Sequence, residues 1–492
     1  MRRTSGTLAF SGGVSAQPGQ QIIRDAVGIA QVDINSDLTP EGWVDWFGSD
    51  ADAIETCFAI FKVTRLSSKD YTTTRTVVLE GNNKKVIGRF GSAEGGGGTR
   101  IVLSGAATAS DPVIRVGTLA TGVGAIPASV SRRVYIEGIN TFRNGVVDPA
   151  VTDRREDAVP GWLCAGLYES EIRQCFDYDS PCHFRVYGNC SVKYVGCYGV
   201  RPNAGSANGH PDFYTAFVVG GYSTSFGFIG ANASVTFEHC GTAGGTGTAR
   251  MGFYLFGFIG DTWITNFEDS QLEFGIYVDG SDIAGAKITT LSAHQDVRIE
   301  ACVLDAHVTN CLTVRNCNEG CGIQLVNNYC ALNAAGEAIL IEDTDGLVLV
   351  SGGDIIANSG LSNRGIKIDT CKSICVQGTL IKDCEVGVQA ISSGQLRLMP
   401  TVRRANAGGI SAVDLQSVGR SFIQAIVDGP ANVLTYGVVA DAGVNYCEVN
   451  ITEVNYGCFT TVSAARKIWY NGATWGGGGT FGTQNIATGV LT

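Results

Sequence analysis

Acidic side chains recur at one position of a strand-like pattern in the middle of the chain. Asp279 lies in the segment IYVDG, Glu342 in ILIED and Asp369 in IKIDT. Alternate residues of a β-strand point to the same side, so these carboxylates are expected to face outward, with Arg315 of LTVRN between the first two. Paired carboxylates can act as general acid and general base on a glycosidic bond. We therefore predict that Asp279 and Glu342 form a catalytic pair.

The spacing of the carboxylates decides which hydrolytic mechanism they fit. Neighbouring strands lie about 4.8 Å apart, so Asp279 and Glu342, two strands apart, would be separated by about 9 to 10 Å at their backbones. Inverting glycosidases need about 6.5 to 9.5 Å between the two carboxyl groups, and retaining ones need about 5 Å. Glu342 with Asp369 would fit retention. A solvated ladder of alternating charge that only stabilises an exposed sheet face is the alternative.

The segment QDVRIEACVLDAH supplies two further candidate catalytic carboxylates, Glu300 and Asp305. Glu300 is expected to point outward beside Arg298, where an ordinary ion pair is the alternative. Asp305 is expected in a turn after the strand, where aspartate often caps its own backbone.

Aromatic residues precede the acidic pattern in the segment GFYLFG. Tyr254 and Phe256 share the outward parity of Tyr277, which predicts an exposed aromatic run suited to the apolar face of a sugar ring. Cover by a loop or by a neighbouring subunit is the alternative. The full predicted substrate-binding set is Tyr254, Phe256, Tyr277, Arg315, Lys367 and Asp369. Tyr277, Arg315 and Lys367 could instead serve a lyase as base and carboxylate neutraliser.

Two sets of apolar residues repeat with one period, which indicates stacked coils of short strands. The first set, which recurs at slightly uneven intervals, is Val297, Ile323, Leu347 and Ile374. The second set, whose last three members are equally spaced, is Ile276, Leu312, Ile339 and Ile366. Small residues align where each coil must bend, at Ala301, Asn327, Ser351 and Gly378. The pattern predicts an all-β solenoid.

Composition limits the fold and the partners. Glycine is abundant at 66 residues and charged residues make up 16%, which favours strands and turns. The net charge of -11 argues against nucleic acid as the partner. The 17 cysteines mostly follow apolar residues, so we expect buried, reduced thiols and synthesis in a reducing cytoplasm. We expect no signal peptide, no membrane insertion, no metal site and no cofactor.

The segments GFIGANASVTFEHC, MGFYLFG, EFGIYVDG, QDVRIEACVLD and NRGIKI resemble coils of bacteriophage tailspikes and capsule depolymerases with a pectate-lyase-like right-handed parallel β-helix. A short amphipathic helix expected over residues 49–64, with Ser49 or Asp50 as N-cap, is similar to the cap that precedes such coils. The resemblance covers residues 45–470. It implies a homotrimer with a sugar groove along its flank and glycosidase or lyase activity.

These observations predict three segments: an N-terminal linker or anchor remnant over 1–45, a β-helix body over 46–430, and a C-terminal β cap or trimer-contact region over 431–492. The expected protein is a phage tailspike in the virion tail, joined to the tail or baseplate through its N-terminal region. It would cleave a bacterial capsule or O-antigen by endo-glycosidic hydrolysis. A polysaccharide lyase and a non-catalytic glycan-binding adhesin are the alternatives.

Overall fold

The structure of the chain is a computed structural model. Apart from short strand segments elsewhere, it describes residues 41–91, 98–118, 130–145, 159–178, 180–201, 214–220, 232–244, 250–257, 260–281, 287–288, 296–357, 363–403, 409–428, 434–441, 444, 446–454 and 459–462. The predicted glycine-rich loop before Thr99 and the segment 1–40 lie largely outside these residues. The chain forms two compact units, Met1–Thr246 and Gly247–Thr492, called here the first and the second unit.

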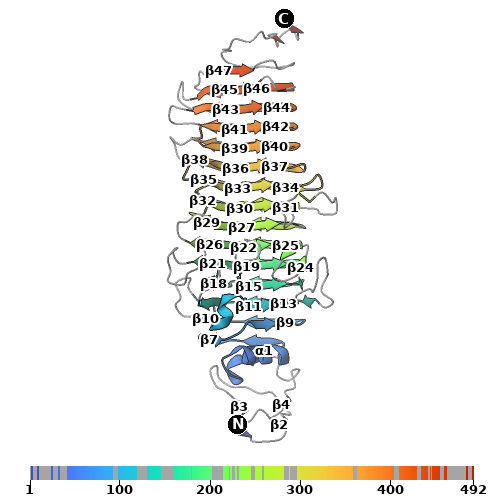
Figure 1. Cartoon of the computed structure of the whole chain (residues 1–492), viewed down its shortest axis with the longest axis vertical. Helices are drawn as coiled ribbons and strands as arrows, with labels where there is room; N and C mark the ends of the chain where they lie inside the picture. The colour runs from blue at the N-terminus through green and yellow to red at the C-terminus, as the bar shows by residue number, and fades with distance from the viewer. Residues whose placement is uncertain are drawn as a thin grey trace. The chain divides into compact units, whose positions relative to one another are not determined.

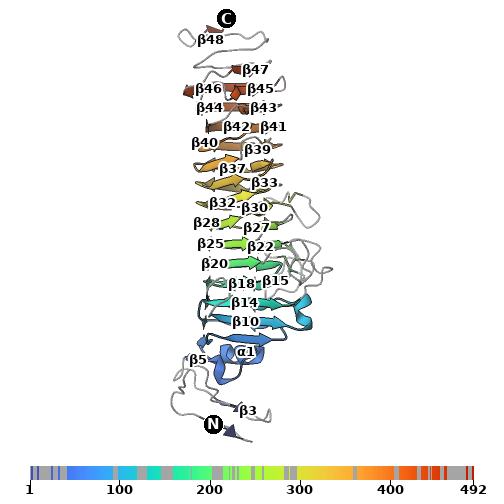
Figure 2. The same cartoon turned by 90° about the vertical axis from the view of Figure 1, so that its left-hand side faces the viewer.

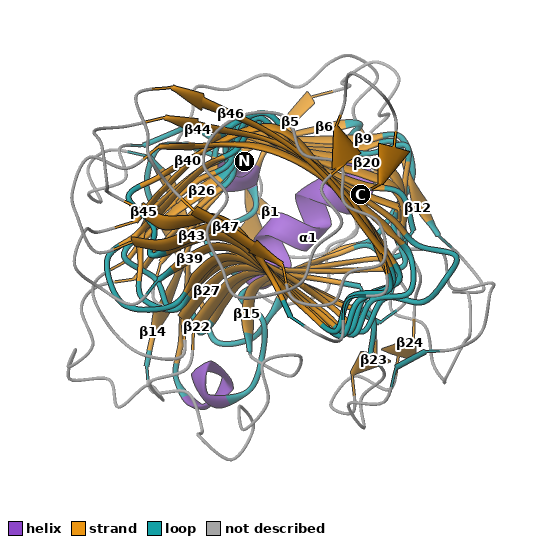
Figure 3. Cartoon of the chain, turned by 90° about the horizontal axis from the view of Figure 1, so that it is seen from above, coloured by secondary structure: helices purple, strands orange, loops and turns teal. Residues whose placement is uncertain are grey.

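The first unit contains a capped helix ahead of most of its strands, as the sequence predicts. Helix α1 (Ala51–Ile60) has Asp50 as its N-cap, whose Oδ1 accepts a hydrogen bond from the backbone N–H of Ala53 at 2.9 Å. Its apolar side, including Ile54 and Phe58, is buried, and the helix packs against the first strands of this unit (Figure 3). The helix therefore covers one end of the apolar core of the first unit.

Apart from short two-stranded pairs such as the antiparallel β23 (Tyr222–Ser223) and β24 (Phe228–Ile229), the strands of the first unit pair in parallel in two sheets. One sheet contains β5 (Glu41–Trp43), β6 (Val63–Arg65), β7 (Asp70–Thr73), β9 (Lys84–Ile87), β10 (Thr99–Ser104), β12 (Ser131–Arg132), β13 (Val134–Glu137), β14 (Ile139–Asn144), β16 (Leu167–Tyr168), β17 (Glu171–Arg173), β18 (Phe176–Tyr178), β20 (Cys190–Val195), β21 (Tyr198–Arg201), β25 (Ala233–Glu238) and β26 (Gly241–Gly244). The other contains β8 (Val77–Leu79), β11 (Ile114–Val116), β15 (Pro160–Ala165), β19 (Cys182–Tyr187) and β22 (Tyr214–Val219).

The second unit repeats this arrangement, and its strands stack one above another (Figures 1 and 2). Its wide sheet contains β28 (Thr262–Thr265), β29 (Glu268–Ser270), β31 (Asp296–Glu300), β32 (Val303–His307), β34 (Gly322–Val326), β35 (Tyr329–Leu332), β37 (Leu347–Ser351), β38 (Asp354–Ala357), β40 (Ser373–Lys382), β42 (Gln395–Arg403), β44 (Arg420–Asp428) and β46 (Tyr446–Val454). Its narrow sheet contains β27 (Arg250–Phe256), β30 (Phe274–Asp279), β33 (Asn310–Arg315), β36 (Glu337–Glu342), β39 (Arg364–Asp369), β41 (Val386–Ile391), β43 (Gly409–Gln416), β45 (Leu434–Ala440) and β47 (Phe459–Val462).

Each coil of the second unit runs from a narrow-sheet strand to the wide sheet and back, which is the winding of a right-handed parallel β-helix. The predicted fold class is confirmed. The parallel pairing continues through β46 and β47, past residue 430. The predicted function of the segment 431–492 as a cap or trimer-contact region stays a prediction.

The strand registers confirm one predicted repeat and correct the other. Ile276, Leu312, Ile339 and Ile366 pair in succession, as predicted. In the wide sheet, however, Val348 and not Leu347 pairs with Ile323 and with Ile374. The predicted inward position of Leu347 is wrong by one residue, and because side chains alternate along a strand, Leu347 lies on the outer face with 53% of its surface exposed.

The bends of the coils use left-handed backbone conformations at aligned positions. Ala301, Asn327 and Gly378 have φ values of 54°, 53° and 64°, as their predicted place at a bend requires. The fourth position is Gly352, with φ of 66°, and not the predicted Ser351, which pairs within β37. A Cβ at Gly352 would lie 2.1 Å from Asn327 Oδ1, so both conformation and space favour glycine there.

Cysteines fill the core as small apolar side chains. Thirteen of the fifteen cysteines whose side chains are described are buried, and the half-exposed ones are Cys190 and Cys375. The predicted burial of the thiols is confirmed. Among the described residues, no helix is both long enough and apolar enough for a membrane span.

Candidate functional site

The predicted charged residues form one row on the outer face of the narrow sheet. The registers pair Asp279 with Arg315, Arg315 with Glu342, and Glu342 with Asp369. Arg315 Nε lies 3.2 Å from Asp279 Oδ2, and its Nη1 lies 3.6 Å from Glu342 Oε1. These four residues, called here the charged ladder, have the predicted order.

The carboxylates of the ladder differ in environment. The side chain of Asp279 is 5% exposed, and its Oδ1 accepts hydrogen bonds from Ser281 N at 3.0 Å, Ser281 Oγ at 2.7 Å and Asn316 Nδ2 at 3.0 Å. Asp279 therefore fixes the corners after β30 and β33. The side chains of Glu342 and Asp369 are 37% and 32% exposed, and they lie on adjacent strands.

The predicted cation Lys367 lies near the exposed end of the ladder. Its side chain is 25% exposed, and its Nζ is 3.9 Å from Asp369 Oδ2. The structure thus places Lys367, Glu342 and Asp369 within reach of a solvent molecule, while Asp279 is enclosed.

The aromatic residues beside the ladder are packed together rather than exposed. Tyr254 and Phe256 stack with ring centroids 5.1 Å apart, and Tyr277 meets Tyr254 edge-on at 5.8 Å. Phe256 is 4% exposed and Tyr277 is 9% exposed, so the prediction of an exposed aromatic run is wrong for both. The rings cover one another, and Arg315 lies over the Tyr277 ring with its Cζ 5.6 Å from the centroid.

The other two predicted catalytic carboxylates lie on the wide sheet. Glu300 Oε2 accepts a hydrogen bond from Arg298 Nε at 2.9 Å, which is the ordinary ion pair of the alternative interpretation. Asp305 lies within β32, where it pairs with Ser270, and not in the predicted turn. The structure therefore does not bring these carboxylates together with Asp279 and Glu342.

A continuous row of outward residues crosses the wide sheet. The registers link one residue from each of eight strands: Trp263, Arg298, Gln324, Leu349, Cys375, Arg397, Phe422 and Glu448. This row is called here the outer column. At about 4.8 Å per strand, its seven steps span roughly 34 Å. Trp263, at the start of the column, is 54% exposed, so its ring is accessible to a ligand.

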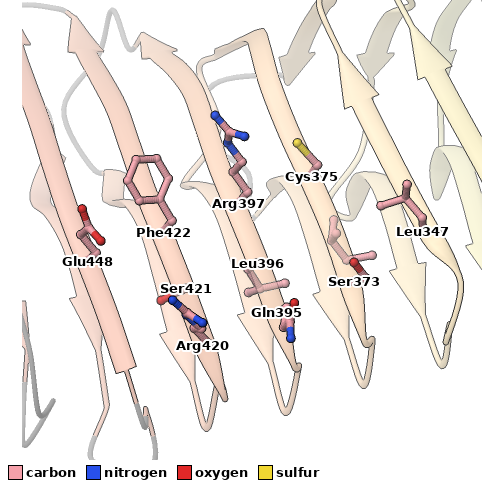
Figure 4. Close-up of a pocket in the computed structure, with 11 residues that line it drawn as sticks. Leu347, Ser373, Cys375, Gln395, Leu396, Arg397, Arg420, Ser421, Phe422 and Glu448 are labelled. Carbon is pink, nitrogen blue, oxygen red and sulfur yellow. The ribbon is translucent and has the colours of Figure 1, made fainter.

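A groove lies along the end of the outer column, over β37, β40, β42, β44 and β46 (Figure 4). Its volume is about 290 Å³. The residues that line it are Leu347, Ser373, Ile374, Cys375, Gln395, Leu396, Arg397, Arg420, Ser421, Phe422 and Glu448. Exposed apolar, amide, hydroxyl and guanidinium groups thus share one concave surface, as they do in sites for polar ligands with apolar faces.

The side chains of the groove have no catalytic arrangement of their own. The Cζ of Arg397 lies 5.9 Å from the Phe422 ring centroid. Burial raises the pKa of the Cys375 thiol, an effect that Arg397 opposes, so Cys375 is a neutral thiol at neutral pH rather than a nucleophile. Glu448 is the one carboxylate among the lining residues.

The sequence predictions missed the groove. Trp263 was recognisable from the segment DTWITNFED, because it alternates with the inward residues Thr262 and Ile264. The apolar repeat in the sequence places Leu347 in the core, one residue before the true inward residue Val348. With this error of one residue, the outward side chains of β37 cannot be identified from the repeat. Correct assignment of the inward and outward residues on each strand of the wide sheet would have revealed the outer column.

Each unit also contains a buried aspartate–histidine pair that the predictions did not include. His183 Nδ1 lies 2.7 Å from Asp177 Oδ2, and His307 Nε2 lies 2.8 Å from Asp269 Oδ1. Burial opposes a charge on His307, but Asp269 outweighs this effect, so the pKa of His307 is raised. All four side chains are fully buried, so they stabilise the interior and cannot reach a polymer substrate. Within the described ranges, no three His, Cys, Asp or Glu side chains gather as metal ligands would.

Comparison with known proteins finds similarity in structure only. No protein-family model and no curated sequence matches the chain. The tailspike protein of Escherichia coli bacteriophage HK620, solved in complex with a pentasaccharide, is 12% identical, with a TM-score of 0.57, over 82% of this chain and 72% of that one. Tailspike protein 3 of bacteriophage CBA120 is 13% identical, with a TM-score of 0.48, over 86% of this chain and 56% of that one.

The match to the CBA120 protein thus covers little more than half of that protein's length. The A-module of the mannuronan C-5 epimerase AlgE4 of Azotobacter vinelandii is 12% identical, with a TM-score of 0.40, over 87% of this chain and all of that module. The resemblance to tailspikes predicted from the sequence is confirmed as a likeness of fold: the chain is a right-handed parallel β-helix of the kind found in the HK620 tailspike.

Proposed function

We propose that the second unit binds a bacterial surface polysaccharide, a capsule or O-antigen, along the outer column. The observation on which this depends is the continuous row of exposed and partly exposed side chains from Trp263 to Glu448, which includes aromatic, amide and guanidinium groups and has a groove at one end. A row of roughly 34 Å suits an extended polymer rather than a single sugar. The HK620 tailspike, which has this fold, is described in complex with a pentasaccharide, and this supports a glycan as the ligand.

The further parts of the proposal follow from the resemblance to tailspikes. We propose that the protein is a component of a phage virion tail, that it is attached through its N-terminal region, and that it is a homotrimer. Light scattering of the purified protein tests the last point, because a monomer mass at micromolar concentration would contradict it.

The geometry of the groove supports binding without cleavage at that surface. Hydrolysis by a glycosidase uses two carboxylates on either side of the bond, and Glu448 is the one carboxylate among the lining residues. The adhesin alternative therefore fits the groove better than the hydrolase does.

Endo-hydrolysis on the narrow sheet is a second candidate function, favoured by one observation. Glu342 and Asp369 are partly exposed and lie on adjacent strands, about 4.8 Å apart at their backbones, which is close to the spacing of retaining enzymes. The originally predicted partner of Glu342, Asp279, is enclosed and already accepts three hydrogen bonds. The candidate pair proposed for catalysis is therefore Glu342 with Asp369, and Asp279 positions Arg315.

The test is incubation of the protein with capsule and lipopolysaccharide from a bacterial panel. Binding, polymer length, new reducing ends and the ultraviolet absorbance of unsaturated uronates are measured together. Shortening with new reducing ends that is lost in Glu342→Gln and Asp369→Asn supports hydrolysis. The control is Glu319→Gln, which should keep the activity, because Glu319 is an exposed carboxylate that pairs with Lys372 and is not part of the ladder. A gain in absorbance indicates a lyase, and binding without shortening indicates an adhesin. Absence of binding to every polymer overturns the proposal.

A further inference from the structure

Arg397 differs from the other arginines whose contacts the structure describes in the second unit. Arg298, Arg315, Arg364 and Arg403 each form an ion pair with a carboxylate. Among the described residues, no carboxylate forms an ion pair with Arg397, although it is exposed and lies in the groove. Its guanidinium is instead over the ring of Phe422, with 5.9 Å between Cζ and the ring centroid (Figure 4).

The charge of the groove is opposite to that of the protein. The chain has a net charge of -11, whereas the lining residues include two arginines, Arg397 and Arg420, and one carboxylate, Glu448. Local positive charge on an otherwise anionic protein attracts an anionic group and gives a neutral group no comparable attraction, so it contributes to selection among ligands.

We infer that the groove takes an acidic polysaccharide and that Arg397 binds the anionic group of one of its sugars. This inference rests on the proposed glycan-binding function and specifies its substrate class. A guanidinium presents a planar fork of N–H donors that matches a carboxylate or a phosphate with two hydrogen bonds. Contact with Phe422 limits the orientations of the fork, so less side-chain freedom is lost on binding.

The test compares each polysaccharide that binds in its native form, after reduction of its carboxyl groups and after removal of phosphate. Titration calorimetry gives the affinity for wild-type protein, Arg397→Gln, Arg397→Lys and Arg403→Gln. Arg403 is the matched control, because it lies on the same strand β42, is exposed and is paired with Asp428 at 2.5 Å. All four proteins are first shown to unfold at the same denaturant concentration.

We expect Arg397→Gln to weaken binding of the native acidic polymer by about 10- to 100-fold, as loss of a charge-assisted bidentate contact does. Arg397→Lys keeps the charge but loses the fork, so its affinity should lie in between, and Arg403→Gln should match wild type. Affinity lost on carboxyl reduction identifies a uronate, and affinity lost only on dephosphorylation identifies a phosphate.

Two outcomes separate this inference from the function on which it rests. Equal affinity for native, reduced and dephosphorylated polymers, with no loss in Arg397→Gln, overturns the acidic substrate class and leaves glycan binding intact. Absence of binding to any polymer by the wild-type protein overturns both.

Discussion

The charged ladder and the groove lie on different sheets of the second unit and differ in what their polar side chains contact. In the ladder, Asp279 accepts hydrogen bonds from Ser281 and Asn316 and contacts Arg315, so its carboxylate is occupied by the protein itself. In the groove, Arg397 is exposed over the Phe422 ring. Charges aligned in register are therefore weaker evidence for a binding site than exposed polar groups beside an aromatic ring.

The largest expected difference between the two regions is in stability. Asp279→Ala should lower the free energy of unfolding by about 3 to 5 kcal/mol, because Arg315, Asn316 and Ser281 would lose a shared buried acceptor. Urea denaturation of the variant and of wild type measures this loss.

Asp369→Ala is the control within the same ladder. Its carboxylate is about a third exposed and its ion contact with Lys367 is long, at 3.9 Å, so the cost should be no more than about 1 kcal/mol. Equal losses in the two variants would contradict the distinction between the enclosed and the open end of the ladder.

The groove should respond to substitution in binding rather than in stability. Phe422→Ala removes the ring beside Arg397 and should weaken glycan binding about tenfold, which corresponds to about 1.4 kcal/mol. Ile426→Ala is the matched control, since Ile426 lies on the same strand β44, is 42% exposed and does not line the groove. Calorimetry measures the affinity of both variants. An equal loss of affinity in both would show that substitution anywhere on β44 weakens binding and that the Phe422 ring has no specific role.

The ladder could be predicted from the sequence because the strands that carry its last three members, Arg315, Glu342 and Asp369, recur at equal intervals. Leu312, Ile339 and Ile366 follow one another at equal intervals, and the outward residues between and after them are fixed by strand alternation. Exposure could not be predicted in the same way. Phe256 points outward in the strand pattern, but its contact with Tyr254 covers it. Whether an outward side chain is covered depends on its neighbours in space, and the repeat length does not determine these.

The groove was not predictable from the same repeat because one coil was aligned a residue out of register. Aligning Gly346 with Gly322 placed Leu347 in the core and left the intervals between the apolar positions uneven. The structure pairs Gly322 with Leu347, so Val348 is inward and the intervals become nearly equal. A slip of one residue exchanges the two faces of a strand. Here the slip placed Leu347 in the core, whereas the side chain lines the groove.

The smallest expected effect is a change in the reactivity of Cys375 in the groove. Burial raises the pKa of this thiol, so its alkylation should be slow at neutral pH and should become faster as the pH rises toward that raised pKa. Arg397 opposes the effect of burial, so Arg397→Gln should slow the reaction further at any given pH. Peptide mass spectrometry after a short pulse of iodoacetamide measures the rate at each cysteine.

A bound glycan should protect Cys375 about twofold when its concentration equals Kd, because half of the grooves are then occupied. Cys190 is the internal control: it is also partly exposed, but it lies on β20 of the first unit and is not among the lining residues of the groove. Protection of Cys375 alone places the polymer on the wide sheet of the second unit, next to Arg397 and Phe422. If a polymer that binds leaves Cys375 as reactive as before while activity depends on Glu342, the glycan lies on the ladder instead, and the roles of the two surfaces are reversed.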